Sequence, residues 1–279
     1  MAEPAGLVAK SGIELLSAGT PNGHKVSVLL EELKEAYGKD YSVQSINIFD
    51  NDKKTQKQPW YTALNPNGRI PTIVDHDRRG FAVFETAAIL TYLVRHYDPE
   101  HKFSFPVDSD DYSVSEQWIA WNQGGLAPMQ SQANLFLRFS PHPEDHPYPI
   151  QRYVGETERL YGVLDTRLAD RDYVAGAGRG RYSIADMSLV GLANTSRFSG
   201  IELKRQFPNV QAWLDRLLAR PAVRRGLAVP DGPMRFANEV LERALNGNDE
   251  EEGLRRMVEE GDRLVRDAKE RFRYVYASP

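Results

Sequence analysis

Hydrophobic positions in the N-terminal third of the chain follow two different spacings. Four segments show the apolar run or the alternating pattern of strands, bounded by turn residues: residues 13–17, 41–48, 70–74 and 81–84. Two others place apolar residues three and four positions apart, as an amphipathic helix does: residues 26–38 and 86–97. The polar stretch at 50–58 is expected to be a loop or a short helix.

The order of these elements is strand, helix, strand, followed by strand, strand, helix. The first group needs a parallel pairing through a crossover helix, and the second an antiparallel hairpin. The pattern therefore predicts an α/β sandwich of about 90 residues, which is near the lower end of independent domain size.

Beyond residue 113 the strand signals vanish and helical spacing remains. Ser183 and Asp186 have the spacing of a capping box, which starts a helix. Helices are expected over seven segments: 114–123, 149–168, 183–196, 210–219, 222–228, 234–245 and 251–273. The predicted organisation is an α/β domain at 10–98, an all-helical domain at 112–228 and a helical extension at 229–279.

The charge balance and the lack of cysteine narrow the possible functions. The chain has 279 residues, with 35 basic and 39 acidic side chains, a net charge of −4 and no cysteine. The near-balance gives no electrostatic reason to expect nucleic acid or an anionic membrane as a partner. A signal-peptide pattern and an apolar run of about 20 residues are both missing, so a cytoplasmic location is expected. Without cysteine, a thiol can enter the chemistry only with a ligand.

Metal and phosphate sites are not expected. His142 and His146 are four residues apart, but the prolines around them exclude a regular helix that would place both on one face. No phosphate-binding glycine loop or nucleophile elbow follows a predicted strand. The glycine-rich segment 176–180 lies between predicted helices, where a flexible connection is expected.

Three short segments at predicted strand ends suggest a single binding site. Thr20-Pro21-Asn22-Gly23 stands where the first strand meets the first helix. A helix N-terminus favours an anion such as a thiolate, and Asn22 would add an amide donor and Thr20 a hydroxyl. The same residues are also standard in turns and helix caps.

The other two segments complete a site of peptide shape. Arg69-Ile70-Pro71 places a proline beside a turn, where a cis peptide would leave the Ile70 backbone free to pair with an extended peptide. Thr86 would hold a carboxylate at a helix N-terminus while Glu85 takes an ammonium group. An ordinary turn or helix cap explains each segment alone, but not the coincidence of all three. Together they describe a site for an extended thiol peptide with a zwitterionic amino-acid end.

These motifs resemble those of the glutathione transferase superfamily, in particular the group of bacterial Nu-class enzymes and fungal Ure2p-like transferases. The similarity covers residues 12–228. In the first part it rests on Thr20-Pro-Asn-Gly-His-Lys25, Asn65-Pro-Asn-Gly-Arg-Ile-Pro71 and Phe84-Glu-Thr-Ala-Ala-Ile-Leu90. In the second part it rests on Trp121-Asn-Gln-Gly-Gly-Leu-Ala-Pro-Met129 and Tyr182-Ser-Ile-Ala-Asp186.

The resemblance implies a thioredoxin-like N-terminal domain, an all-helical C-terminal domain and a homodimer. It implies that Asn22 contacts the sulfur of glutathione, with Thr20 beside it, and that Glu85 and Thr86 hold the γ-glutamyl end. Glutathione, reduced or oxidised, would be the co-substrate, and no metal is implied.

Five further positions are assigned to glutathione by the same resemblance. Ile70, flanked by Arg69 and Pro71, would pair with the peptide backbone. Gln56 matches a glutathione-contacting position of the group, and Arg152 matches an arginine that members use near a second glutathione or the disulfide form.

The activity that the resemblance implies is glutathione-dependent reduction of disulfide bonds, with some transferase and peroxidase activity. A protein without cysteine would need two glutathiones, or oxidised glutathione, for thiol–disulfide exchange. One alternative is a conventional detoxifying transferase whose helical domain binds apolar electrophiles near Trp118 and Trp121. Another is a non-catalytic glutathione-binding scaffold, and the long C-terminal extension is the feature that favours this alternative.

Overall fold

The structure is a computed structural model that describes residues 6–48, 54–247 and 251–272. Its packing divides the chain into two compact units, which are described separately. The first unit consists of Met1–Ser115, Tyr182–Gly191 and Leu217–Met234. The second consists of Glu116–Arg181, Leu192–Arg216 and Arg235–Pro279.

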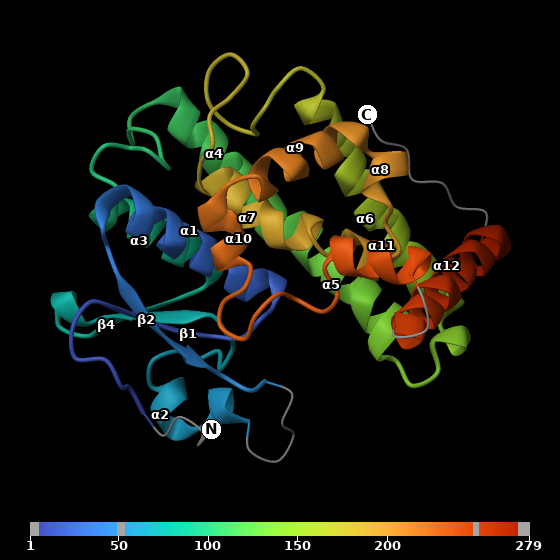
Figure 1. Cartoon of the computed structure of the whole chain (residues 1–279), viewed down its shortest axis with the longest axis horizontal. Helices are drawn as coiled ribbons and strands as arrows, with labels where there is room; N and C mark the ends of the chain where they lie inside the picture. The colour runs from blue at the N-terminus through green and yellow to red at the C-terminus, as the bar shows by residue number, and fades with distance from the viewer. Residues whose placement is uncertain (1–5, 49–53, 248–250, 273–279) are drawn as a thin grey trace. The chain divides into compact units, whose positions relative to one another are not determined.

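A four-stranded sheet forms the centre of the first unit (Figure 1). Its strands are β1 (Ile13–Ser17), β2 (Tyr41–Ser45), β3 (Thr72–Asp75) and β4 (Phe81–Phe84), in the order β2-β1-β3-β4. β1 pairs parallel with β2 and antiparallel with β3, and β3 pairs antiparallel with β4. The predicted parallel pairing and hairpin are confirmed. β2 ends earlier than predicted, and β3 begins after Pro71 rather than at Ile70.

Helices cover both faces of this sheet (Figure 1). α1 (Pro21–Tyr37) and α3 (Thr86–Tyr97) pack together on one face. α2 (Pro59–Thr62) lies on the other, where Leu16, Ile46 and Tyr61 form a buried cluster. This is the expected thioredoxin-like arrangement. Part of the polar stretch at 50–58 lies outside the described residues, and Thr55–Lys57 forms the short 3₁₀ helix η1.

α10 (Pro221–Gly226) belongs to the first unit because it packs tightly along α1. A Cβ atom at Gly226 would lie 2.5 Å from the Cα of Val28, so only glycine permits this approach. The hydroxyl of Ser27 donates a hydrogen bond to the Gly226 carbonyl at 2.7 Å. Arg220 donates two hydrogen bonds to the carboxylate of Glu32, at 2.7 and 2.8 Å. These contacts fix the helix that begins at the candidate site.

The predicted capping box at the start of α7 (Ile184–Ala193) is confirmed. The carboxylate of Asp186 accepts a hydrogen bond from the backbone N–H of Ser183 at 3.0 Å. The Ser183 hydroxyl accepts one from the N–H of Ala185 at 3.3 Å. Amides that the helix leaves without partners are therefore satisfied by side chains.

In the second unit, every regular element that the structure describes is helical. The longer helices of this part of the chain are α4 (Asp110–Trp121), α5 (Ala127–Asn134), α6 (Pro147–Leu168), α9 (Pro208–Leu218), α11 (Asn238–Asn246) and α12 (Glu252–Phe272). α8 (Leu203–Gln206) and the 3₁₀ helix η6 (Ser196–Ser199) are short.

α5 is the one long helix of the second unit that the hydrophobic pattern does not predict. The helical pattern is interrupted there by three residues with low helix propensity, Gly124, Gly125 and Pro128. The chain accommodates them through a π-helical turn, η3 (Asn122–Leu126), just before α5. A second π-helical turn, η4 (Leu135–Phe139), follows it. Such turns absorb residues that a regular α-helix excludes.

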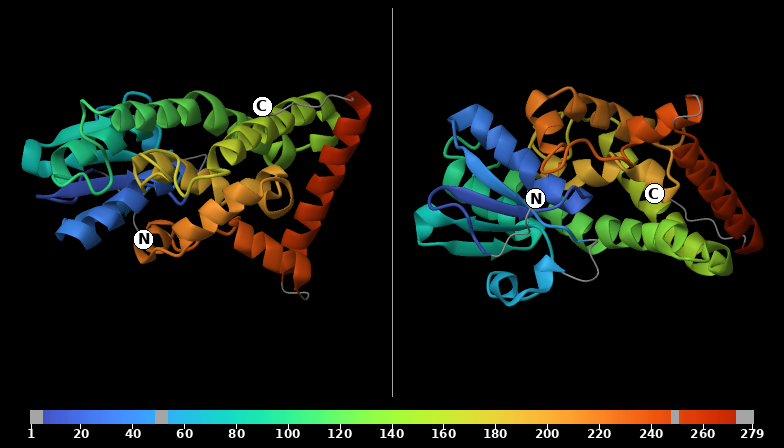
Figure 2. Two further views of the ribbon diagram at one scale, coloured as in Figure 1. Left: turned by 90° about the horizontal axis from the view of Figure 1, so that it is seen from above. Right: turned by 60° about the horizontal axis from the view of Figure 1, so that its bottom comes forward.

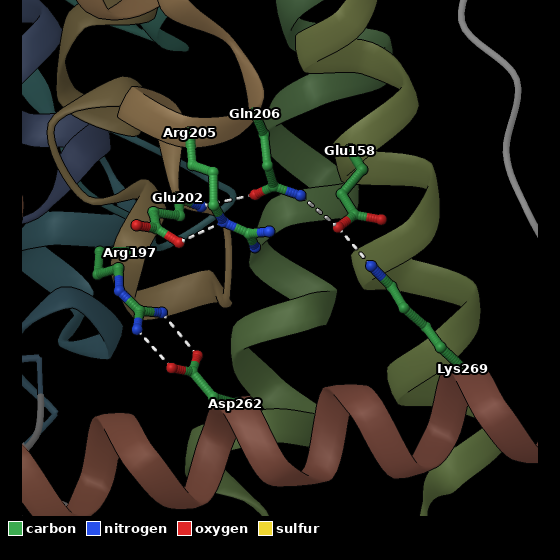
Figure 3. A network of polar contacts seen from close by, with 7 residues as sticks. All are labelled: Glu158, Arg197, Glu202, Arg205, Gln206, Asp262 and Lys269. Carbon is green, nitrogen blue, oxygen red and sulfur yellow. Dashed lines mark hydrogen bonds and ion pairs between the residues drawn. The ribbon is translucent and has the colours of Figure 1, made fainter.

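Helix α12 of the expected extension is held to the second unit by charged side chains (Figure 3). The guanidinium of Arg197, which is 9% exposed, forms a two-fold hydrogen-bonded ion pair with Asp262, at 2.7 and 2.5 Å. Further along α12, Lys269 donates to the carboxylate of Glu158 on α6. Glu158 also accepts from the side-chain amide of Gln206 at 2.9 Å.

A buried arginine supports the middle of α12 as well. Arg138 donates to the carbonyl of Phe198 at 2.8 Å and to the carbonyl of Met257 on α12. Burial lowers its pKa to about 10, so the guanidinium stays charged at neutral pH. A buried apolar cluster adds to these contacts and packs α11 and α12 into the second unit. Its members are Phe198, Leu241, Ala244, Leu254 and Val258. Figure 2 shows α12, in red, as a single long helix.

Gly261 provides a direct test of how α12 is docked. A Cβ atom at this position would lie 2.1 Å from Nη1 of Arg138. We expect Gly261→Ala to lower the free energy of unfolding by about 1–3 kcal/mol, because the buried guanidinium would have to leave its carbonyl partners. Urea denaturation followed by circular dichroism measures this change.

Gly253, in the first turn of the same helix, is a matched control. No atom lies within 4 Å of a Cβ built there, so Gly253→Ala should leave stability unchanged or raise it by about 0.5 kcal/mol. Equal effects of the two substitutions would contradict the proposed docking contact.

Candidate functional site

The strand register brings the three predicted segments to one side of the sheet, where β1 and β4 end and β3 begins. This side is called the sheet edge. Leu16 at the end of β1 lies opposite Thr72 at the start of β3, and Thr72 lies opposite Phe84 at the end of β4. The residues that follow Leu16 and Phe84, and those that precede Thr72, therefore leave the sheet at the same edge. These are the segments that contain Asn22, Glu85 and Ile70.

Thr20 and Asn22 have different positions at the start of α1. The Thr20 hydroxyl accepts a hydrogen bond from the N–H of Gly23 at 3.1 Å, so Thr20 is the N-cap of the helix. Asn22 is the second residue of α1, and its side chain is exposed. The first turn carries no acidic side chain, which leaves the positive end of the helix dipole available to an anion.

Two glycines hold this loop in place. A Cβ atom at Gly23 would lie 2.3 Å from the carbonyl oxygen of Ala18 and 2.5 Å from the Ser17 hydroxyl. A Cβ atom at Gly191 on α7 would lie 2.6 Å from the carbonyl oxygen of Pro21. Both contacts are closer than any side chain allows, so the loop is packed from inside and from α7.

The Arg69-Ile70-Pro71 segment is also fixed from behind. The carbonyl of Arg69 accepts hydrogen bonds from the hydroxyl of Tyr61 and the side-chain amide of Asn65, both at 2.8 Å. The Ile70–Pro71 peptide bond is cis, as predicted. Among the described residues, the backbone N–H and C=O of Ile70 take part in no backbone hydrogen bond. The segment thus presents a short stretch of unpaired backbone beside the start of β3.

Gln56 lies next to the turn that leads into this segment. A Cβ atom at Gly68 would lie 2.8 Å from the carbonyl oxygen of Gln56, so the two backbones are in contact. The Gln56 side chain is 7% exposed, and its Oε1 finds no hydrogen-bond donor within the described part of the chain. A buried acceptor without a donor costs free energy and is a suitable partner for an N–H of a ligand.

Glu85 and Thr86 form the junction between β4 and α3. Glu85 has a φ of 69°, a region that non-glycine residues rarely occupy. Such strain at one residue is typical of binding and catalytic sites. The carboxylate of Glu85 is exposed and accepts a weak hydrogen bond from the side chain of Asn67 at 3.4 Å. Thr86 is the buried first residue of α3, at the N-terminal end of its dipole.

Sequence reasoning missed two buried residues of α1 that directly follow the loop, His24 and Lys25. Lys25 is fully buried; desolvation lowers its pKa to about 8, and the negative charge of Glu85 opposes that shift. His24 is also buried, and burial lowers its pKa to about 4, so its imidazole is neutral. The signal that could have found Lys25 is its spacing, one helical turn after Asn22.

Arg152 belongs to the second unit and not to the sheet edge. It lies on α6, with 43% of its side chain exposed, and pairs with Glu156 at 3.8 Å. Trp118 and Trp121, also in the second unit, pack edge to face with ring centroids 5.1 Å apart. The binding roles of Arg152 and of the sheet-edge residues stay predictions.

In the segments 6–48, 54–247 and 251–272 no group of three or more histidine, aspartate and glutamate side chains is placed to hold a metal ion. No helix in those same segments combines the length and the apolar character that crossing a bilayer requires.

Two family models match the sequence. The model of the glutathione S-transferase N-terminal domain matches residues 20–96, and that of the glutathione S-transferase C-terminal domain matches residues 126–221. Glutathione S-transferase 2 of Schizosaccharomyces pombe is 36% identical over 220 residues, which cover 74% of this chain and 90% of that protein. Disulfide-bond oxidoreductase YfcG of Escherichia coli is 34% identical over 219 residues, which cover 77% and 94%.

Solved structures agree with these sequence relatives. A glutathione transferase homolog from Lodderomyces elongisporus, solved with two glutathiones per subunit, has a TM-score of 0.71 and 39% identity, with 79% of this chain and 99% of that chain covered. Glutathione transferase URE2P8 from Phanerochaete chrysosporium, solved with oxidized glutathione, has a TM-score of 0.70 and 28% identity, with 79% and 95% covered.

Proposed function

Because this chain belongs to the glutathione S-transferase family and is a glutathione transferase-like enzyme, we propose that it binds glutathione at the sheet edge and reduces disulfide bonds with it. Some transferase and peroxidase activity accompanies the reductase activity. The observation that carries the proposal is the register that aligns Leu16, Thr72 and Phe84, and with them the three loop segments.

The chemistry of the sheet edge matches the parts of glutathione. Glu85 would take the ammonium group of the γ-glutamyl end, and the N-terminus of α3 at Thr86 its carboxylate. The unpaired backbone of Ile70, between Arg69 and Pro71, would pair with the cysteinyl residue as an added strand does. The unsatisfied Oε1 of Gln56 would accept from a ligand amide.

The thiol of glutathione would lie at the N-terminus of α1. A thiol with an ordinary pKa near 8.5 is mostly protonated at neutral pH and is then a poor nucleophile. The side-chain amide of Asn22 and the free N–H groups of the first turn would stabilise the thiolate. Thr20 would act from beside the sulfur, mainly by capping the helix. Each unit by which the thiol pKa falls corresponds to about 1.4 kcal/mol.

Disulfide reduction then proceeds without any thiol of the protein. The glutathione thiolate attacks one sulfur of the substrate disulfide, forms a mixed disulfide and releases the other sulfur as a thiolate. A second glutathione attacks the glutathione sulfur of that mixed disulfide, giving oxidised glutathione and the reduced product. The relatives named as a disulfide-bond oxidoreductase and as structures with two glutathiones or oxidised glutathione support this choice.

Arg152, the domain division and the cellular setting are part of the same proposal. We assign Arg152 to a second glutathione or to the disulfide form, and we divide the chain at 10–98, 112–228 and 229–279. A cytoplasmic location fits the proposal because the reducing glutathione pool lies there. The second substrate would be a disulfide or an electrophilic small molecule.

A homodimer completes the proposal. Phe81 is 56% exposed on β4, the edge strand of the sheet, and stacks on Tyr92 with ring centroids 5.7 Å apart. An exposed aromatic on an edge strand is a suitable contact for a second copy. Light scattering should give twice the chain mass of 31.6 kDa; a value equal to one chain at micromolar concentration would contradict the dimer.

The role of Asn22 is tested by substitution. We expect Asn22→Ala to lower turnover of a mixed disulfide of glutathione by about tenfold or more, because the bound thiolate loses a donor. Stability should change little, since the side chain is exposed. Asn246→Ala, at an exposed position of α11, should leave the rate unchanged.

Comparison of two substrates separates the reductase from the alternative activities. Faster turnover of a chlorinated nitrobenzene than of the mixed disulfide would favour a conventional transferase. Glutathione binding without turnover of either substrate would favour a scaffold. An unchanged rate in Asn22→Ala would remove Asn22 from the mechanism.

A further inference from the structure

Lys25 is a buried cation near the N-terminus of α1, the end of the helix that lies at the candidate site. Its side chain is 0% exposed, and it follows Asn22 by one helical turn. Three residues span about 4.5 Å along a helix axis, so Lys25 lies close to the end of α1 that carries the loop. A buried ammonium group costs considerable free energy, and such groups are retained where their charge has a use.

The charge of Glu85 favours the protonated form of Lys25. Burial lowers the pKa of the ammonium group to about 8, and the carboxylate of Glu85 works in the opposite direction. Glu85 itself is at the junction of β4 and α3, at the same sheet edge. Lys25 therefore combines an electrostatic interaction with the junction before α3 and a position three residues after Asn22 on α1.

The other titratable groups on α1 and on α10, which packs against it, do not supply a comparable charge there. His24 is buried and neutral. The carboxylates of Glu31 and Glu32, further along α1, form ion pairs with Arg225 and Arg220 of the α10 region. Lys25 is thus the buried positive charge of α1 that is nearest in sequence to the anion-binding end of the helix.

We propose that Lys25 is a positioning residue for the thiol chemistry, whose buried positive charge on α1 stabilises the thiolate of glutathione at the loop of Thr20 and Asn22. The inference rests on the proposed function. When the thiol ionises, its proton leaves to water and the sulfur retains the electron pair. The resulting negative charge is held by Asn22, by the helix N-terminus and by Lys25, which acts through space and without contact to the substrate.

Replacement of Lys25 by methionine tests the proposal. Methionine has similar length and no charge. Because loss of one member of an interacting pair of charges costs stability, circular dichroism checks that Lys25→Met is folded before its thiol is titrated. We expect the thiol of bound glutathione, titrated by the ultraviolet absorbance of the thiolate, to ionise about one pH unit higher in Lys25→Met than in the unaltered protein. Affinity for S-methylglutathione, which cannot ionise at sulfur, should stay within about twofold.

The two ligands distinguish an electrostatic role from a structural one. Equal weakening of glutathione and S-methylglutathione would mean that the substitution distorts the site, and would overturn the proposal. An unchanged thiol titration would overturn it as well. Lys34→Met, at an exposed lysine of the same helix, is the matched control and should behave as the unaltered protein. If the unaltered protein binds neither ligand, the proposed function fails, and this inference fails with it.

Discussion

The antiparallel pairing of β3 with both β1 and β4 is the constraint on which the candidate site depends. It aligns Leu16, Thr72 and Phe84 across the sheet. Three segments that are far apart in sequence then leave the sheet at one edge. A shift of one residue in either pairing would turn the side chains of that strand to the opposite face. Packing of the sheet against α1 and α3 on one side and α2 on the other makes such a shift costly.

The loops at that edge are held by backbone contacts that are too close for any residue with a Cβ atom. Gly23 and Gly191 enclose the backbone from Ala18 to Pro21, and Gly226 presses α10 against α1. Tyr61 and Asn65 hold the carbonyl of Arg69. A site built in this way is preorganised, because the groups that meet a ligand do not have to be ordered on binding.

Much of the first unit follows from local sequence. The alternation of apolar residues predicted β1 and β4 with their observed bounds, and the helix over 86–97 coincides with α3. Turn chemistry around Pro71 predicted the cis bond. These features depend on neighbours along the chain, which periodicity and turn residues report. The three motifs together predicted one shared site, and the strand register brings their segments to the same edge of the sheet.

The remaining features depend on contacts between distant residues. The burial of Lys25 and its electrostatic interaction with Glu85 arise only when segments distant in sequence pack together. The left-handed backbone of Glu85 has no signal in its own side chain. Helix α5 is masked by Gly124, Gly125 and Pro128, and the docking of α12 depends on Arg138 meeting Gly261 across the fold. The spacing of apolar residues along one segment does not predict contacts between residues that are far apart in sequence.

Binding of glutathione at the sheet edge is measurable by a nuclear magnetic resonance titration. Backbone amide signals of uniformly ¹⁵N-labelled protein are followed as glutathione is added. We expect the amides of Gly23, Ile70 and Thr86 to shift together and to saturate along one binding curve. Saturable shifts confined to other parts of the chain, or no saturable shift at these three amides, would contradict it.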